Sequence, residues 1–177
     1  DLAQTVRREA ATMQRQVEHH LARARAVGRR GAAQARAVVR ESVDSVSRAV
    51  GLLYPNVRLD AAGDGTLIAR VERQDLDELI GNLLENAAKY GGGSVFVTIQ
   101  RDGNMAEILI EDDGAGISPA DRDRVIDRGV RLDSGKPGTG LGLAIVRDVA
   151  EIYGGSIALE ESEDLGGLLV RLRLPAG

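Results

Sequence analysis

The sequence has no cysteine, and this absence removes several kinds of chemistry at once. Disulfide bonds, a zinc ion held by thiolates and a cysteine nucleophile are all excluded. Aromatic residues are nearly as scarce, with Phe96 and three tyrosines, so the core must be built from valine, leucine, isoleucine and alanine. No apolar run approaches the roughly 20 residues of a membrane-spanning helix, and no signal-peptide pattern opens the chain. A soluble, cytoplasmic chain is therefore expected.

Lysine is also rare, because only Lys89 and Lys136 stand among 23 basic residues. The formal net charge of -4 divides unevenly along the chain. Residues 1–50 carry ten arginines against five acids, whereas residues 51–177 carry thirteen basic against twenty-two acidic side chains. Nucleic-acid binding depends on clustered positive charge. The acidic balance after residue 50 therefore argues against a nucleic-acid partner.

Apolar residues near the N-terminus recur at alternating spacings of four and three, which is the spacing of a heptad seam. The seam consists of Val6, Ala10, Met13, Val17, His20, Ala24 and Val27. It predicts a long helix that packs against other helices. Since no capping signal precedes it, the helix is expected to be cut from a longer parent. The segment GRRG at 28–31 interrupts the pattern, which separates residues 1–30 from residues 31–177.

After this first helix, the chain alternates between helical and strand patterns. The elements expected are a helix over 35–53, strands over 57–61 and 66–71 that form a hairpin, a helix over 75–90, strands over 94–100 and 106–112, a short helix over 118–128, a helix over 141–153, and strands over 156–161 and 168–174. This order predicts an α/β layer with a mostly antiparallel or mixed sheet, preceded by a long helix.

The segment GKPGTGLGL at 135–143 places four glycines directly before a predicted helix. Glycine loops before helices often bind phosphate, because the first amides of the helix and its dipole favour an anion. The spacing fits neither a dinucleotide fingerprint, with glycines at i, i+2 and i+5, nor a P-loop. Gly138, Gly140 and Gly142 remain at a spacing of two. A flexible surface loop explains them equally well at this point.

Two further segments favour a nucleotide. EDDGAGI at 111–117 follows a predicted strand, where its glycines allow close backbone approach and Asp112 could accept a hydrogen bond from an exocyclic amine. NLLENAAKY at 82–90 places five polar residues on one helix face, namely Asn82, Glu85, Asn86, Lys89 and Tyr90. Such a face is usually only a solvated surface. Asparagine oxygens, however, suit Mg²⁺, which favours hard oxygen ligands.

Taken together, NLLENAAKY, DDGAG and GTGLGL resemble the N, G1 and G2 boxes of histidine kinases within the GHKL family of ATPases. Residues 35–174 carry the resemblance, including the closing segment SIALEESEDLGGLLVRLRLP. DRGVRLDSGKPGTG is similar to the lid of PhoQ-type sensor kinases. Residues 1–30 resemble the second helix of a dimerisation and phosphotransfer hairpin. The resemblance implies that residues 31–177 form an ATP-binding catalytic domain with the Bergerat fold, which is a two-layer α+β sandwich with a mixed sheet.

The family's functional roles then fall on particular residues of this chain. The resemblance implies that Asp112 binds the adenine amine, that Asn82 and Asn86 hold Mg²⁺, and that Glu85, Lys89 and Arg131 serve catalysis. The remaining nucleotide-binding residues that it implies are Tyr90, Gly114, Gly116, Ile117, Lys136, Gly138, Thr139, Gly140, Leu141 and Gly142. The implied cofactors are ATP and Mg²⁺. Both lysines of the chain belong to this set.

The chain departs from the family pattern at two points. Ile126 stands where the lid has a phenylalanine. The family phosphorylates a histidine followed by an acid, but the sequence here is EHHLAR: His20 lies in the seam, where packing is expected, and His19 is expected to face solvent. The implied partners are therefore a missing helix that bears the phosphoacceptor, a response regulator, and a second copy that could associate through residues 1–30. Two alternatives remain, an ATP-dependent gating module without phosphotransfer and a serine-directed kinase of the anti-sigma type.

Overall fold

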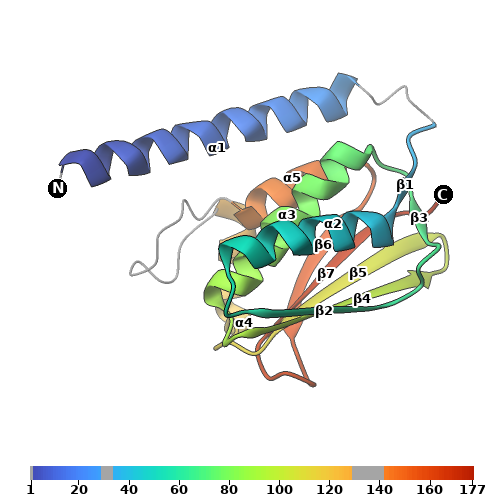
Figure 1. Ribbon diagram of the computed structural model, residues 1–177. Coiled ribbons are helices and arrows are strands. Elements are labelled where there is room, and N and C mark those ends of the chain that lie inside the picture. Colours follow the sequence, from blue (N-terminus) through green and yellow to red (C-terminus); the bar gives the residue numbers. More distant parts are fainter. Residues whose placement is uncertain (1, 29–33, 129–141) are drawn as a thin grey trace.

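Three helices lie side by side over one face of a five-stranded sheet (Figure 1). They are α2 (Val39–Leu53), α3 (Arg73–Tyr90) and α5 (Gly142–Ile152). The structure is a computed structural model that describes residues 2–28, 34–128 and 142–177, without the side chains of 15–16, 18–28 and 127–128. Helix α1 (Leu2–Gly28) runs outside the helical layer, and α4 (Pro119–Arg128) lies at one end of it. The predicted two-layer α+β sandwich after a long helix is confirmed.

The sheet is mixed, in the order β2-β4-β5-β7-β6. Its strands are β2 (Arg58–Gly63), β4 (Ser94–Asp102), β5 (Met105–Asp112), β6 (Ser156–Glu161) and β7 (Leu168–Pro175). Only the β2–β4 pair is parallel, whereas the other three pairs are antiparallel. β5 and β7 therefore occupy central positions, and the end of β5 at Asp112 lies at the edge of the layer where several loops meet.

The predicted hairpin between 57–61 and 66–71 is wrong. β2 pairs with β4, whereas the later segment contributes the short strand β3 (Ile68–Ala69), which pairs with β1 (Ala37–Val38) in a separate two-stranded sheet. The turn explains the divergence, because Asp64 Oδ1 accepts hydrogen bonds from both the backbone and the hydroxyl of Thr66, at 2.8 and 2.7 Å. The chain then turns toward α2, where Leu67 O accepts a hydrogen bond from Val39 N at 3.0 Å. The helix expected to begin at residue 35 begins at Val39 instead, because residues 37–38 form β1.

Alternating residues of the central strands point toward the helices and form the core, as a strand period of two requires. On the sheet side these residues are Val95, Val97, Ile99, Ile108, Ile110, Val170, Leu172 and Leu174, none more than 4% exposed. Five apolar residues of α3 face them and are at most 1% exposed, namely Leu76, Leu79, Ile80, Leu83 and Leu84. Burial of each such side chain contributes about 1.5–3 kcal/mol. The expected core of valine, leucine, isoleucine and alanine is confirmed.

Polar contacts fix α3 between its two neighbouring helices. On the α2 side, the hydroxyl of the fully buried Ser42 donates to Asp77 Oδ1, which also accepts from Arg73 Nε at 2.8 Å. On the α5 side, the hydroxyl of Tyr153 donates to the buried carboxylate of Asp75. Arg73, Asp75 and Asp77 all belong to the first turns of α3. Their hydrogen bonds hold this end of the helix against its neighbours, and the last turns of α3 lie at the opposite end of the helical layer.

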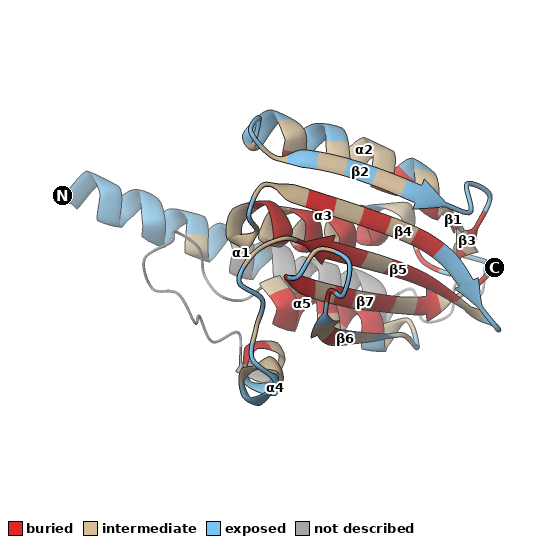
Figure 2. Cartoon of the chain, turned by 90° about the horizontal axis from the view of Figure 1, so that it is seen from below, coloured by how far each residue is buried: buried red, intermediate tan, exposed pale blue. Residues whose placement is uncertain are grey.

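In the part of the chain that the structure describes, no helix covers the outer face of the sheet (Figure 2). This face carries a ladder of charged and polar side chains. Glu107 lies at its centre and is 3% exposed. It accepts hydrogen bonds from Gln100 Nε2 at 2.7 Å and from Arg171 Nη1 at 3.0 Å. Arg171 Nε in turn donates to Glu160 Oε2 at 2.7 Å. Arg173 Nε lies 3.4 Å from Glu107 Oε1. The ladder therefore links β4, β5, β7 and β6.

Glu107→Gln is expected to reduce the free energy of unfolding by about 2 kcal/mol at pH 7, since a buried hydrogen-bonded charge is lost. Burial alone raises the pKa of Glu107, but the hydrogen bonds from Gln100 and Arg171 and the charges of both arginines lower it below its ordinary value of 4.5. The unfolded chain therefore takes up a proton first as the pH falls. The stabilisation is complete above pH 4.5 and is lost as the pH falls through the lower folded-state pKa.

Urea denaturation of wild type and variant at pH 7 and pH 3 measures this difference. The matched control is Glu163→Gln in the exposed β6–β7 turn, which should change stability by less than about 0.5 kcal/mol. A wild-type advantage that stays constant between the two pH values would contradict the account of Glu107.

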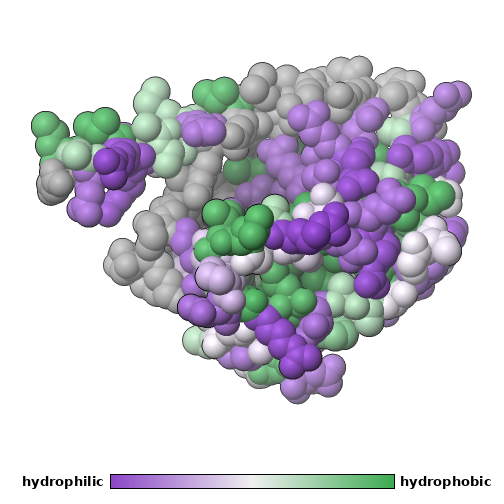
Figure 3. Space-filling view, in the orientation of Figure 1, coloured by the Kyte–Doolittle hydropathy of each residue, from purple (hydrophilic) through white to green (hydrophobic). Residues whose placement is uncertain are grey.

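Large apolar side chains are exposed on α1 and at the end of α2 (Figure 3). On α1, Leu2, Val6, Met13 and Val17 are between 55% and 80% exposed. At the end of α2, Leu52 and Leu53 are 84% and 70% exposed. The part of the predicted seam that the structure describes is thus exposed, whereas the side chains of His19 and His20 lie outside the described residues.

Candidate functional site

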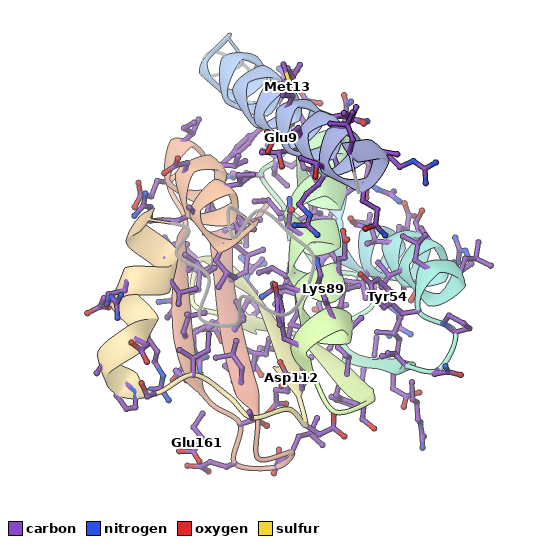
Figure 4. All side chains as sticks on the ribbon, turned by 90° about the vertical axis from the view of Figure 1, so that its left-hand side faces the viewer. Glu9, Met13, Tyr54, Lys89, Asp112 and Glu161 are labelled. Atoms are coloured by element: carbon purple, nitrogen blue, oxygen red, sulfur yellow. The ribbon has the colours of Figure 1, made fainter. Side chains whose placement is uncertain are left out.

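The end of α3, the end of β5 and the start of α5 come together at one end of the layer (Figure 1). Figure 4 views the molecule from this end, with Lys89 of α3 and Asp112 of β5 on the side facing the viewer. Two contacts establish the arrangement. A Cβ on Gly142 would lie 3.8 Å from Asn82 Oδ1, and a Cβ on Gly114 would lie 2.5 Å from Tyr90 O. Residues 82–90, residues 111–117 and Gly142 at the end of the glycine-rich segment therefore lie close together, whereas residues 135–141 of that segment lie outside the described part of the chain.

The last three turns of α3 have one buried and one polar face. The half-buried polar residues are Asn82, Glu85, Asn86, Lys89 and Tyr90. Asn82 Nδ2 donates to the backbone oxygen of Glu78 at 3.0 Å, one turn earlier. This hydrogen bond uses the donor group of the carboxamide and directs Oδ1 away from the helix, toward Gly142. The helix thus presents an acceptor oxygen at the start of α5.

Lys89 and Tyr90 end α3 as a pair. Lys89 Nζ lies 5.8 Å from the centroid of the Tyr90 ring, which is within the range of a cation–π contact. The helix stops immediately afterwards at Gly91, whose backbone N–H still donates to Ala87 O at 2.9 Å. The ammonium group therefore stands beside an aromatic ring at the end of the helix, next to the loop that follows β5.

Asp112 is the last residue of β5 and is only 6% exposed. Its Oδ1 accepts two backbone hydrogen bonds, from Gly114 N at 2.9 Å and from Leu168 N at 3.3 Å. Both donors bind the same oxygen. The two amides therefore hold the carboxylate in one orientation and leave Oδ2 as the atom that can accept from a ligand.

The electrostatic environment of Asp112 favours a ligand with a hydrogen-bond donor. Burial raises the pKa of Asp112, the amides of Gly114 and Leu168 act against this, and the charge of Asp113 raises the pKa further. The carboxylate is thus less well solvated than an exposed aspartate. A donor at Oδ2 would offset part of that desolvation. An exocyclic amine on a flat base meets this requirement, whereas a carbonyl oxygen at the same position could only accept and would not.

Glycine is required at Gly114 because backbone atoms approach it from two segments. A Cβ at this position would lie 2.5 Å from Tyr90 O and 2.8 Å from Gly91 Cα. On the neighbouring side of the loop, Asp113 Oδ1 accepts from Gly92 N and Ser94 N, both at 2.9 Å. The loop after β5 and the end of α3 are therefore packed backbone to backbone, and the site has little room for added side chains.

The other residues of the predicted set differ in what the structure says of them. Gly116 has a φ of +71°, and Ile117 packs against the core, as does Ile126 in α4. Gly142 begins α5, whose first turn holds no acid, so its amides can face an anion. The residues in 129–141 lie outside the described part of the chain, namely Arg131, Lys136, Gly138, Thr139, Gly140 and Leu141.

Sequence reasoning missed the turn between β6 and β7. Leu168 supplies one of the two amides that donate to Asp112. Gly167 packs so closely against Asp112 that a Cβ on Gly167 would overlap Asp112 O and Oδ1. Asp113 was also missed, although it ties the end of α3 to the start of β4. The paired glycines of LGG indicated a turn, but only the register of β7 beside β5 brings that turn to Asp112.

Comparison with known proteins identifies this architecture. A family model described as "Histidine kinase-, DNA gyrase B-, and HSP90-like ATPase" matches residues 71–177. The chain belongs to this family. Its sequence is similar to those of sensor kinases, and its fold is similar to that of histidine kinase ATP-binding domains. The predicted family and the Bergerat-type fold are therefore confirmed.

Three relatives illustrate the range of similarity within the ATPase family. The sensor protein kinase CarS of Pseudomonas aeruginosa is 36% identical over 99% of this chain and 39% of its own length. The two-component sensor PhoQ of the same organism is 36% identical over 91% of this chain and 36% of its own length. The ATP binding domain of PrrB from Mycobacterium tuberculosis superposes with a TM-score of 0.68 at 28% identity, covering 80% of this chain and 96% of that domain.

The chain spans less than two fifths of either sensor kinase. Within the ranges 2–28, 34–128 and 142–177, no helix combines the length and apolar character needed to cross a bilayer.

Proposed function

We propose that this chain binds Mg-ATP and is the catalytic part of a sensor histidine kinase, which transfers the γ-phosphoryl group to a histidine outside the chain. The observation that carries the proposal is the pair of backbone amides that donate to Asp112 Oδ1. They leave Oδ2 as the atom that would accept from a ligand beside the polar face of α3. Membership of the ATPase family and the similarity to CarS and PhoQ support it.

The base and the phosphates would occupy opposite ends of the site. Adenine would donate its exocyclic amine to Asp112 Oδ2, with Tyr90 beside the ring and Gly114, Gly116 and Ile117 forming the pocket. The phosphates would lie between Asn82, Lys89 and the first amides of α5 at Gly142, where an anion is favoured. Arg131, Lys136, Gly138, Thr139, Gly140 and Leu141 would close on them from the lid, as the resemblance implies.

The chemistry of the donor set fits magnesium. Among the residues that the structure describes, no three His, Asp or Glu side chains gather as a metal site. The protein ligands would be the carboxamide oxygens of Asn82 and Asn86, and the orientation of Asn82 Oδ1 toward Gly142 suits this role. When bound, Mg²⁺ would neutralise part of the phosphate charge. Phosphoryl transfer depends mainly on such positioning and neutralisation.

The proposed reaction forms a bond between a histidine ring nitrogen and the γ-phosphorus and breaks the bond between that phosphorus and the β–γ bridging oxygen, which leaves with ADP. Glu85 would orient the histidine or accept the proton of its ring nitrogen, while Lys89 and Arg131 would stabilise the charge on the transferred group. The phosphohistidine would then supply an aspartate of a response regulator.

We further propose that residues 1–30 are the second helix of a phosphotransfer hairpin, and that the acceptor histidine lies on its first helix in the parent protein. The exposed Val6, Met13 and Val17 would pack against that helix or a second copy. Since ATP is the phosphoryl donor, the domain would work on the cytoplasmic side of the parent's membrane.

Asn82→Ala is expected to remove most of the magnesium-dependent part of ATP binding. Alanine has the higher helix propensity, so α3 should remain intact. Isothermal titration with ATP in MgCl₂ and in EDTA separates the two parts. In EDTA, the variant should bind ATP with the wild-type affinity. The increase in ATP affinity that Mg²⁺ produces should be about tenfold smaller in the variant than in wild type. If Mg²⁺ increased the ATP affinity of the variant as much as that of wild type, Asn82 would not be a metal ligand.

Two experiments test the proposed function in sequence. Titration of the wild-type chain with Mg-ATP should give saturable heat, and its absence would end the proposal. Incubation with γ-labelled ATP and a separately expressed first helix of the parent should then place acid-labile label on that helix. Binding without transfer would indicate a gating module, and acid-stable label would indicate a serine-directed kinase; either result contradicts histidine phosphorylation.

A further inference from the structure

Ser162 makes three hydrogen bonds across the turn between β6 and β7. Its backbone N–H donates to Gly167 O, and its carbonyl accepts from Gly166 N, both at 2.8 Å. Its hydroxyl oxygen accepts a third hydrogen bond from Leu165 N at 3.0 Å. Ser162 is 1% exposed although it lies in a surface turn. The conformation of residues 162–167 thus depends on this one side chain and its backbone.

The hydroxyl of Ser162 also donates to Glu111 Oε1 at 2.9 Å. Glu111 is 8% exposed, and its neighbour along β5 is Asp112. Because a buried carboxylate without a donor is costly, this hydrogen bond ties the turn firmly to β5. The connection joins residues 51 positions apart in sequence.

The exit of the same turn touches Asp112. Gly167 packs against the backbone and Oδ1 of Asp112, and Leu168 N–H donates to that oxygen at 3.3 Å. Asp112 is therefore held by the turn on one side and by Gly114 on the other. A shift of residues 167–168 would lengthen the Leu168 hydrogen bond and rotate the carboxylate.

We propose that the Ser162–Glu111 hydrogen bond is a positioning contact for Asp112, which sets how well Oδ2 accepts the exocyclic amine of a purine base. This inference rests on the proposed function, because it requires adenine at Asp112. Neither Ser162 nor Glu111 touches the ligand. Hydrogen bonds weaken steeply with distance and angle, so a small rotation of the Asp112 carboxylate lowers affinity for the amine without closing the pocket.

The test compares ADP with purine riboside diphosphate, which lacks the 6-amine, by titration into wild type, Ser162→Ala and Glu111→Gln. Wild type should prefer ADP. Ser162→Ala should raise the Kd for ADP by about fivefold and leave the Kd for purine riboside diphosphate within about twofold of wild type. Glu111→Gln keeps an acceptor for the hydroxyl and should retain the wild-type preference.

A loss confined to ADP in Ser162→Ala, together with a wild-type preference for ADP in Glu111→Gln, supports the positioning role. Equal loss for both nucleotides, no loss for either, or a Ser162→Ala chain that does not fold would each assign the hydroxyl a role unrelated to Asp112 and overturn the inference. A wild-type chain that binds neither nucleotide would instead overturn the proposed function itself, so the two failures are distinguishable.

Discussion

Replacing Asp112 with asparagine is expected to weaken ATP binding by about 100-fold and to reverse the base preference in favour of inosine triphosphate. The two amides on Oδ1 determine this outcome, since they require an acceptor oxygen at that position. Asparagine must therefore place its NH₂ group where Oδ2 stood. That group would face the adenine amine donor to donor, which costs about 2–3 kcal/mol for an unsatisfied buried group. Inosine presents a carbonyl oxygen there, which can accept.

Titration of both triphosphates into wild type and Asp112→Asn measures the reversal. The neighbouring Asp113→Asn is the matched control, because Asp113 Oδ1 also accepts two backbone amides, from Gly92 and Ser94. The half-exposed Asp113 is outside the proposed base contact, so this variant should keep the wild-type preference for ATP. Equal weakening of ATP by the two substitutions would show that the carboxylate of Asp112 does not meet the base.

Gly114→Ala is expected to abolish measurable ATP binding and to lower the free energy of unfolding by about 2–3 kcal/mol. The added Cβ would lie 2.5 Å from Tyr90 O and 2.8 Å from Gly91 Cα, and both are backbone atoms that cannot rotate away. The loop after β5 must then separate from the end of α3. This movement displaces the Gly114 amide from Asp112 and disturbs the base pocket directly.

Thermal unfolding and ATP titration of the variant give both quantities. Gly65→Ala provides the control, since a Cβ on Gly65 meets no atom within 4 Å. It should change stability by less than about 0.5 kcal/mol and leave ATP binding intact. Wild-type affinity in Gly114→Ala would mean that the contact between the loop and α3 does not shape the site.

Local pattern predicted most of the elements because each has a strong period of its own. The alternation in SVFVTIQ and AEILIED identified β4 and β5, and the apolar face of DLDELIGNLLENAAKY identified α3. The hairpin before α3 failed for a different reason. β2 and the residues after Gly63 both alternate, but alternation does not specify a partner, and β2 pairs in parallel with a strand more than thirty residues later.

The residues of the proposed site also fall into two groups, those that local sequence indicates and those that only the tertiary fold brings to the site. Asp112, Gly114 and the polar face of α3 could be proposed from sequence, because their residue types are unusual for a strand end and a helix surface. Ser162, Gly167 and Leu168 could not, since an ordinary hairpin turn uses the same residues. Only the antiparallel register of β5 with β7, which pairs Glu111 with Leu169, brings that turn against Asp112. This information is tertiary and has no local signal.

The most direct test is a crystal structure of the chain with Mg²⁺ and a non-hydrolysable ATP analogue. We expect the exocyclic amine to lie within hydrogen-bond distance of Asp112 Oδ2 and the phosphates to lie between Asn82 and the first turn of α5. Density for the base at any other position, or phosphates that approach neither α3 nor Gly142, would contradict this prediction.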